Sequence, residues 1–224
     1  MPVMHPRLRH LAPLVLSLTA AFGVTGCNPP PRDSSQQWVA RDAWDSGCAE
    51  QGIIAAGNGF GFQLLARVNA AEPTENHFLS PLSASMALGM AMNGTAGATQ
   101  DEMRAALGYG AMARTDVLTA YRDLIAMLRG LDARVDFRIA NAIFYRGSFA
   151  PAIAPTFLTE SKSYFDATSA ALDFNSPSSL TTINGWAGTA TNGKITKVLD
   201  ELSPELVMLL MNAIYFKGDW REGF

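Results

Sequence analysis

The segment that comes nearest to a chemical site is glycine-rich and ends in a lysine, Gly188-Thr-Ala-Thr-Asn-Gly193-Lys194. Its spacing nearly matches G-x-x-x-x-G-K-[ST], in which backbone N–H groups and the lysine hold phosphates and the last hydroxyl holds magnesium. Position 195 is Ile, so that hydroxyl is missing or displaced to Thr196. The motif also needs a strand before it, whereas a helical pattern precedes this copy. We therefore expect no nucleotide binding.

A second candidate is the pair His77 and Ser80. Acyl transfer would also need an acid that orients the histidine and a shaped oxyanion site, and the chain contains no G-x-S-x-G elbow. Because Ser80 directly precedes Pro81, the sequence instead predicts that Ser80 caps a helix beginning at Pro81. The His, Cys, Asp and Glu residues show no metal-ligand spacing. The sequence therefore predicts that the protein is not an enzyme and has no metal or cofactor site.

The composition fits a folded domain with a mildly acidic surface. Of 224 residues, 48% are hydrophobic and 17% are charged, which is enough apolar material for a sizeable core. The formal charge is −3, and no basic stripe is present, so nothing favours nucleic acid as a partner. The two cysteines, Cys27 and Cys48, are too few for a disulfide-stapled scaffold.

The first 26 residues have the layout of a secretory signal. The first ten residues contain Arg7 and Arg9 and no acidic residue. Positions 11–24 then form a largely apolar stretch that is too short to span a membrane comfortably. It ends in Val24-Thr25-Gly26-Cys27, which resembles a bacterial lipobox. The resemblance implies cleavage before Cys27 and lipidation of that cysteine. An ordinary secretory signal with a cysteine near the cleavage site is the alternative.

The residues after Cys27 are rich in proline and small polar side chains, which is typical of a stiff, solvated tether. We therefore predict three parts: a lipoprotein signal peptide at 1–26, a Pro/Ser-rich tether at 27–52 and a globular part at 53–224. The predicted location is outside the cytoplasm, either lipid-anchored to a bacterial cell envelope through Cys27 or extracellular.

The globular part alternates helical and extended patterns. A helix is predicted over 53–70, and a second over Pro81–Met92, which has no charge and is therefore expected to be buried on all sides. From Val135 the apolar period changes to two, which predicts a strand with Asn141 on its apolar face. The nearly unbroken apolar run Leu206–Phe216 fits a strand buried on both faces.

Two segments of the chain echo each other position by position. Asn141-Ala-Ile-Phe-Tyr-Arg-Gly147-Ser-Phe149 matches Asn212-Ala-Ile-Tyr-Phe-Lys-Gly218-Asp-Trp220. We interpret the copies as two neighbouring strands of one sheet, in similar register, that end at the same edge. The distance between the copies is too long and irregular for a solenoid.

Three ordered motifs within residues 55–224 resemble the serpin family. The first is Asn76-His-Phe-Leu-Ser80-Pro81-Leu-Ser83, followed by the small-residue helix and Asn93-Gly-Thr-Ala-Gly97-Ala-Thr99. The second is Ile183-Asn184-Gly-Trp186 with Thr191-Asn-Gly193-Lys194-Ile195, which is similar to the family's helix F and its exit. The third is Met211-Asn212-Ala-Ile-Tyr-Phe-Lys-Gly218-Asp-Trp220, which is similar to the third strand of the main sheet.

The resemblance implies an α+β fold in which helices pack on a large central β-sheet, truncated after the third strand of that sheet. It implies an inhibitor that is consumed once: a protease cuts an exposed reactive loop, becomes covalently attached, and the loop inserts into the sheet. The expected partner is a serine protease, or alternatively a cysteine protease. The reactive loop is not in this chain. A non-inhibitory serpin-fold binding module and a non-functional fragment are the alternatives.

The resemblance also implies roles for individual residues. Ser80, Ser83 and Asn212 fall at the shutter, where the sheet parts above the buried helix. Trp220 falls at the breach, where insertion would begin; plain core packing is its alternative. The helix F motif contributes four residues: Asn184, Trp186, Gly193 and Lys194.

Overall fold

The computed structural model describes residues 48–130 and 134–218. The predictions for the signal peptide, for most of the tether including Cys27, and for Trp220 lie outside these residues. The described chain forms a sheet of order β2-β1-β3 and six α-helices. Their bounds are α1 Cys48–Ala71, α2 Pro81–Asn93, α3 Gly97–Ala106, α4 Arg114–Arg129, β1 Asp136–Arg146, the 3₁₀ helix η2 Gly147–Ala152, α5 Pro155–Phe165, β2 Ala167–Leu172, α6 Pro177–Ala190 and β3 Met208–Lys217.

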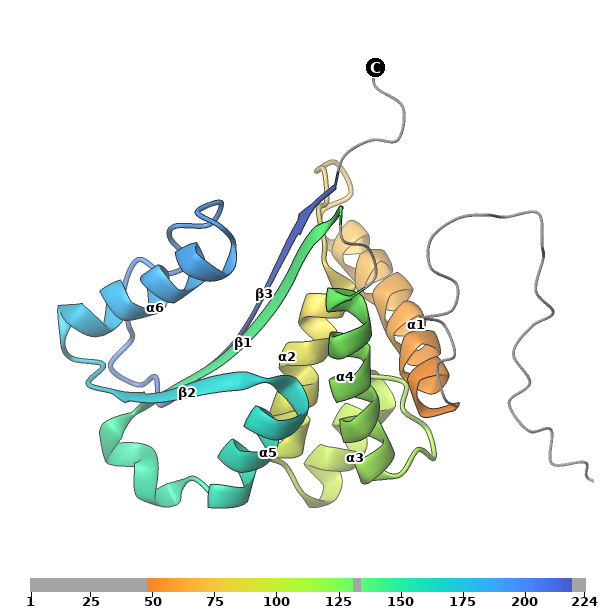
Figure 1. Ribbon diagram of the computed structural model, residues 1–224, viewed down its shortest axis with the longest axis horizontal. Helices are drawn as coiled ribbons and strands as arrows, with labels where there is room; N and C mark the ends of the chain where they lie inside the picture. Colours follow the sequence, from red (N-terminus) through yellow and green to blue (C-terminus); the bar gives the residue numbers. More distant parts are fainter. Residues whose placement is uncertain (1–47, 131–133, 219–224) are drawn as a thin grey trace, which may run out of the picture. The chain divides into compact units, whose positions relative to one another are not determined.

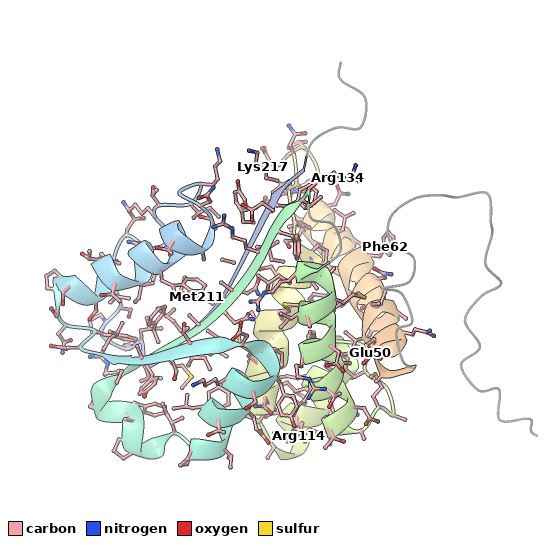
Figure 2. All side chains as sticks on the ribbon, in the orientation of Figure 1. Glu50, Phe62, Arg114, Arg134, Met211 and Lys217 are labelled. Carbon is pink, nitrogen blue, oxygen red and sulfur yellow. The ribbon has the colours of Figure 1, made fainter. Side chains whose placement is uncertain are left out.

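The sheet separates two groups of helices (Figure 1): α1–α5 lie on one side and α6 lies on the other. Side chains alternate between the two faces, as the period-two pattern predicts. Phe137 and Ile139 of β1 join the large core formed with α1, α2 and α4. Ala142 and Phe144 join a smaller cluster with α6. Met211 of β3 belongs to this second cluster and is labelled in Figure 2.

The two copies of the repeated segment lie in β1 and β3, and these strands are neighbours, as predicted. The strands are antiparallel, so the prediction that both copies end at the same edge was wrong. Asn141 lies opposite Asn212, and Arg146 and Lys217 therefore lie at opposite ends of the pair. A period-two pattern determines which side chains share a face, and it is the same for either strand direction.

Two helix predictions need correction. Helix α1 begins at Cys48, so residues 48–52, which we assigned to the tether, are helical. Helix α2 was expected to be buried on all sides, but Leu88 is 39% exposed. The reason is that α1, α3, α5 and β3 pack around α2 and leave Leu88 uncovered within the described residues.

Strand β3 is covered on both faces, by α2 and by α6. Its residues from Met208 to Asn212 are nevertheless only half-buried. This follows from the topology, because β3 pairs with β1 along one edge and with no strand of the described chain along the other. Among residues 48–130 and 134–218, none of the helices combines the length and apolarity needed to cross a bilayer.

Candidate functional site

Two asparagine side chains fasten the middle of the β1–β3 pair. Asn212 donates its Nδ2 to Asn141 Oδ1 at 2.8 Å, and Asn141 donates its Nδ2 to the main-chain oxygen of Phe165 at 2.6 Å. Asn212 Nδ2 also lies 3.6 Å from Met86 Sδ of α2. Asn212 Oδ1 is buried and has no hydrogen-bond partner within the described residues. A polar chain therefore links β3 to β1 and to the last residue of α5.

The residues assigned to the shutter lie at the start of α2 and on β3, the strand that packs against it. Ser80 is the N-cap of α2, because its Oγ accepts the main-chain N–H of Ser83 at 3.3 Å and Pro81 is the first helical residue. The predicted capping role of Ser80 is thus confirmed. Asn212 contacts α2 at Met86. In the described part of the chain, no hydrogen bond joins Asn212 to Ser80 or to Ser83. The shutter role of the three residues stays a prediction.

Ser80 also lines a hollow of about 770 Å³ beside the end of β3. Lys194 from the loop after α6 and Lys217 from β3 line it as well. Two aromatic side chains at this hollow face solvent: Phe78 is 100% exposed and Phe216 is 66% exposed. Exposed aromatic rings beside an unpaired strand edge are typical of a surface that another polypeptide covers.

The helix F motif attaches α6 to the loop that follows it and to β1. Asn184 Oδ1 accepts the main-chain N–H groups of Val198 and Leu199 at 2.8 and 3.1 Å, and its Nδ2 donates to the Leu199 oxygen at 2.9 Å. Trp186 packs edge-to-face on Phe144, with ring centroids 6.2 Å apart. Asn184 and Trp186 therefore hold the helix over the sheet.

Gly193 and Lys194 lie just after α6 and do not form a phosphate loop. Gly193 has a φ of +76°, and its N–H donates back to the oxygen of Gly188 at 2.7 Å. The glycine-rich segment is thus the carboxyl end of a helix, where free carbonyls create a negative potential. A phosphate instead needs the free N–H groups of a helix amino end. The helix that precedes the motif was predicted, and it is the reason for the mismatch.

The comparisons with known proteins identify the family. Residues 55–224 match the family described as Serpin (serine protease inhibitor). This chain belongs to the serpin family. Iripin-1 of Ixodes ricinus is 36% identical over 185 residues, which cover 79% of this chain and 46% of that protein. The leukocyte elastase inhibitor of Sus scrofa is 33% identical over 176 residues, with shares of 77% and 46%.

Solved structures agree with the sequence relatives. Cleaved kallistatin complexed with heparin superposes with a TM-score of 0.72 at 25% identity, over 77% of this chain and 51% of that chain. The predicted serpin fold of helices on a β-sheet is confirmed, and the family's description is that of an inhibitor, in agreement with the prediction that this serpin chain is not an enzyme. The chain spans about half the length of the curated relatives it matches.

Several polar contacts of the serpin chain leave no sign in the sequence. Arg114 of α4, labelled in Figure 2, donates hydrogen bonds to Glu160 of α5 and to Asn93 of α2. The hydrogen bonds from Arg114 hold the pKa of Glu160 below its usual range. Arg114 and its two partners come from three different helices, 21 and 46 residues apart in sequence, so no local pattern could reveal the contacts.

A buried tyrosine pair lies beneath the sheet. The hydroxyls of Tyr109 and Tyr121 share a hydrogen bond, and Tyr121 also donates to the Ser85 oxygen at 2.9 Å. Burial raises the pKa of both phenols. Gly89 leaves room for Tyr121, because an added Cβ would lie 2.9 Å from the ring. The pair ties α2 to α4 and to the loop after α3.

Asn141 is the most informative of the residues that the sequence analysis left out of the site. It begins one copy of the repeated segment, and Asn212 begins the other. That coincidence was the available signal, but only the antiparallel register shows that the two asparagines face each other.

Within the described ranges, no group of three or more His, Cys, Asp or Glu side chains could hold a metal ion.

Proposed function

We propose that these residues form the N-terminal half of a serpin-type inhibitor that is consumed by the serine protease it traps. The observation that carries this proposal is the state of β3. Both of its faces are covered, by α2 and α6, while only one of its edges is paired within the described chain. The outer edge therefore offers main-chain groups to which a further strand can add. The family description and the name of the Sus scrofa relative support an inhibitory role.

The energetic argument for strand addition follows from the same edge. The outer edge of β3 offers main-chain N–H and C=O groups, and each net hydrogen bond to them is worth about 1 kcal/mol. The added strand also covers apolar side chains such as Phe216, which is 66% exposed. Burial of apolar area contributes about 25 cal/mol per Å². Insertion of a cleaved loop would thus release free energy that can distort an attached protease.

The test uses the product of the whole gene that contains these 224 residues. It is mixed with trypsin-, chymotrypsin- and elastase-type serine proteases and with a papain-type cysteine protease. We expect an adduct with a serine protease that survives denaturing gel electrophoresis and has the summed mass of its parts. The matched control is the same protease with its catalytic serine replaced by alanine, which should give no adduct.

A second measurement separates inhibition from binding. The melting temperature of the gene product is compared before and after limited cleavage of its exposed loop. An inhibitor should gain stability on cleavage because the loop inserts into the sheet. Absence of an adduct together with an unchanged melting temperature would overturn the proposal in favour of a serpin-fold binding module.

We further propose that the protein is exported and anchored in a membrane by acyl chains on Cys27. The support is the order of a charged start, an apolar stretch and Val24-Thr25-Gly26-Cys27 in the sequence. Each buried methylene of an acyl chain adds about 0.8 kcal/mol, so two or more chains anchor a protein firmly. In cells fed a labelled fatty acid, we expect the wild-type protein to carry the label and Cys27→Ala to carry none. Cys48→Ala is the matched control and should keep the label; equal labelling of wild-type and Cys27→Ala protein would refute the anchor.

A further inference from the structure

We propose that Asn141 is a positioning residue that determines which way the amide of Asn212 faces. The geometry is set from the main-chain oxygen of Phe165, because a carbonyl oxygen can act only as a hydrogen-bond acceptor. Asn141 must therefore present Nδ2 to it, at 2.6 Å. Oδ1 of Asn141 is then left for β3, and Asn212 must present its own Nδ2, at 2.8 Å. The orientation of both amides thus follows from one carbonyl.

The Phe165 oxygen is available because α5 ends there. The last carbonyls of a helix have no partner within the helix, and Asp166 leaves the helix in a left-handed conformation with a φ of 51°. Asn141 supplies the missing donor from the neighbouring strand. The packing of Phe165 against Tyr121, with ring centroids 5.0 Å apart, keeps this carbonyl in place.

Burial makes the orientation strict. Asn141 is 2% exposed, and Met86 and Phe165 beside the pair are both 0% exposed. Reversing the Asn141 amide would place two acceptors together at Phe165 and two donors together at Asn212. Unpaired polar groups in such an apolar surrounding are costly, so neither amide can flip alone.

The fixed orientation also determines where the fourth polar atom of the pair, Asn212 Oδ1, points. It is a buried acceptor without a partner within the described residues. Because Asn141 prevents the Asn212 amide from turning over, any group that comes to pair with this atom must be a hydrogen-bond donor. Assigning that donor to a strand added beside β3 rests on the proposed function; the orientation of the two amides does not.

The first test uses Asn141→Asp and Asn141→Leu. An aspartate at 141 still accepts from Asn212, but as a carboxylate it faces the Phe165 oxygen without a donor. When protonated, its O–H can donate to Phe165 as the amide did. Burial and the carbonyl should raise the pKa of this carboxyl above its unfolded value of about 3.9. The stability that this protonated carboxyl contributes is then fully present below the unfolded pKa, and it is lost as pH rises through the folded pKa.

The measurement is urea unfolding between pH 4 and pH 7, compared with wild-type protein at each pH. Between its unfolded and folded pKa values, we expect the folded-to-unfolded ratio of Asn141→Asp to fall about tenfold per pH unit relative to wild type. Asn141→Leu cannot donate at any pH and should show no such relative trend. If Asn141→Asp follows the wild-type pH profile, Asn141 does not donate to Phe165 and the proposal fails.

The second test observes Asn212 itself, by hydrogen exchange of the ¹⁵N-labelled asparagine side-chain amides. We expect the Asn212 Nδ2 protons to be protected in wild type and in Asn141→Asp, and to lose protection in Asn141→Leu. The Asn184 amide, held by Leu199, serves as the reference within the same sample. Unchanged protection of Asn212 in Asn141→Leu would overturn the proposal.

A matched variant separates positioning from general destabilisation. Ser179→Ala removes another hydrogen bond of a buried side chain, from Ser179 Oγ to the Asp173 oxygen at 2.6 Å, on the α6 side of the sheet. We expect it to lower the urea midpoint without changing the exchange of Asn212; loss of Asn212 protection in this variant would mean that Asn141 acts only through stability. If Asn141→Leu does not fold, the pH profile of Asn141→Asp still decides. No protease enters these measurements, so their outcome is independent of adduct formation.

Discussion

The two copies of the repeated segment have nearly the same sequence and different surroundings. In β1 the copy lies in the middle of the sheet, between β2 and β3; in β3 it lies at an edge of the described sheet. Ile143 is 0% exposed, whereas its counterpart Ile214 is half-buried. Tyr145 is half-buried, whereas its counterpart Phe216 is 66% exposed. Within the described residues, the same pattern is therefore more deeply buried in β1 than in β3.

The asparagines that begin the two copies repeat this difference. Both polar atoms of the Asn141 side chain are paired, whereas Asn212 keeps a buried oxygen without a partner in the described residues. The main-chain N–H and C=O groups along a strand edge without a neighbour likewise lack ladder partners. The outer edges of β2 and β3 are both unpaired within the described residues, and it is at β3 that the proposed function requires a new strand.

The largest expected effect comes from the matched isoleucines. Ile143→Ala removes a fully buried side chain from the middle of the sheet and should lower the free energy of unfolding by about 3–4 kcal/mol. Ile214→Ala removes a half-buried one and should lower it by about 1–2 kcal/mol. Urea unfolding of both variants measures the difference. Equal losses would show that the two copies are equally supported and would break the comparison.

A smaller effect is expected at the basic residues that close the copies. Arg146 donates to the main-chain oxygens of Leu206 and Pro204 at 3.1 and 2.9 Å and lies over the ring of Phe174. Arg146→Ala should therefore cost about 1–2 kcal/mol, while Lys217→Ala, at an exposed position, should change the free energy of unfolding by less than about 0.5 kcal/mol. Thermal unfolding monitored by circular dichroism compares them, and a larger loss for Lys217→Ala would contradict the comparison.

The smallest effect on stability is expected at Phe78, which flanks the outer edge of β3 and is 100% exposed. Phe78→Ser should change the free energy of unfolding by less than about 0.5 kcal/mol. It should also reduce self-association, because it removes an apolar group beside an unpaired strand edge. Light scattering at rising concentration measures this. Phe144→Ser is the control within the copy in β1. Phe144 is 5% exposed, so its loss should destabilise the protein and increase aggregation.

The sequence by itself determined those features that depend on neighbouring residues. The N-cap of α2 follows from Ser80 and Pro81, which are adjacent in the chain. The two faces of β1 follow from apolar residues at every second position, and the pairing of β1 with β3 was inferred from the repeated pattern. The helical end that replaces a phosphate loop at Gly193 was also predicted. The cap, the two faces of β1 and the helical end rest on local geometry, which the order of residues specifies directly. The pairing of the two strands was inferred instead from the likeness of their sequences.

The tertiary structure alone decided the direction of β3, the pairing of Asn141 with Asn212, and the contacts of Arg114 with Glu160. In each case the partners are separated by tens of residues, and the chain path between them selects one of several arrangements that the local pattern allows. A period-two strand packs equally well in either direction, and an asparagine can offer its partner either a donor or an acceptor. Which of these arises depends on the carbonyl, strand or helix that folding brings beside it.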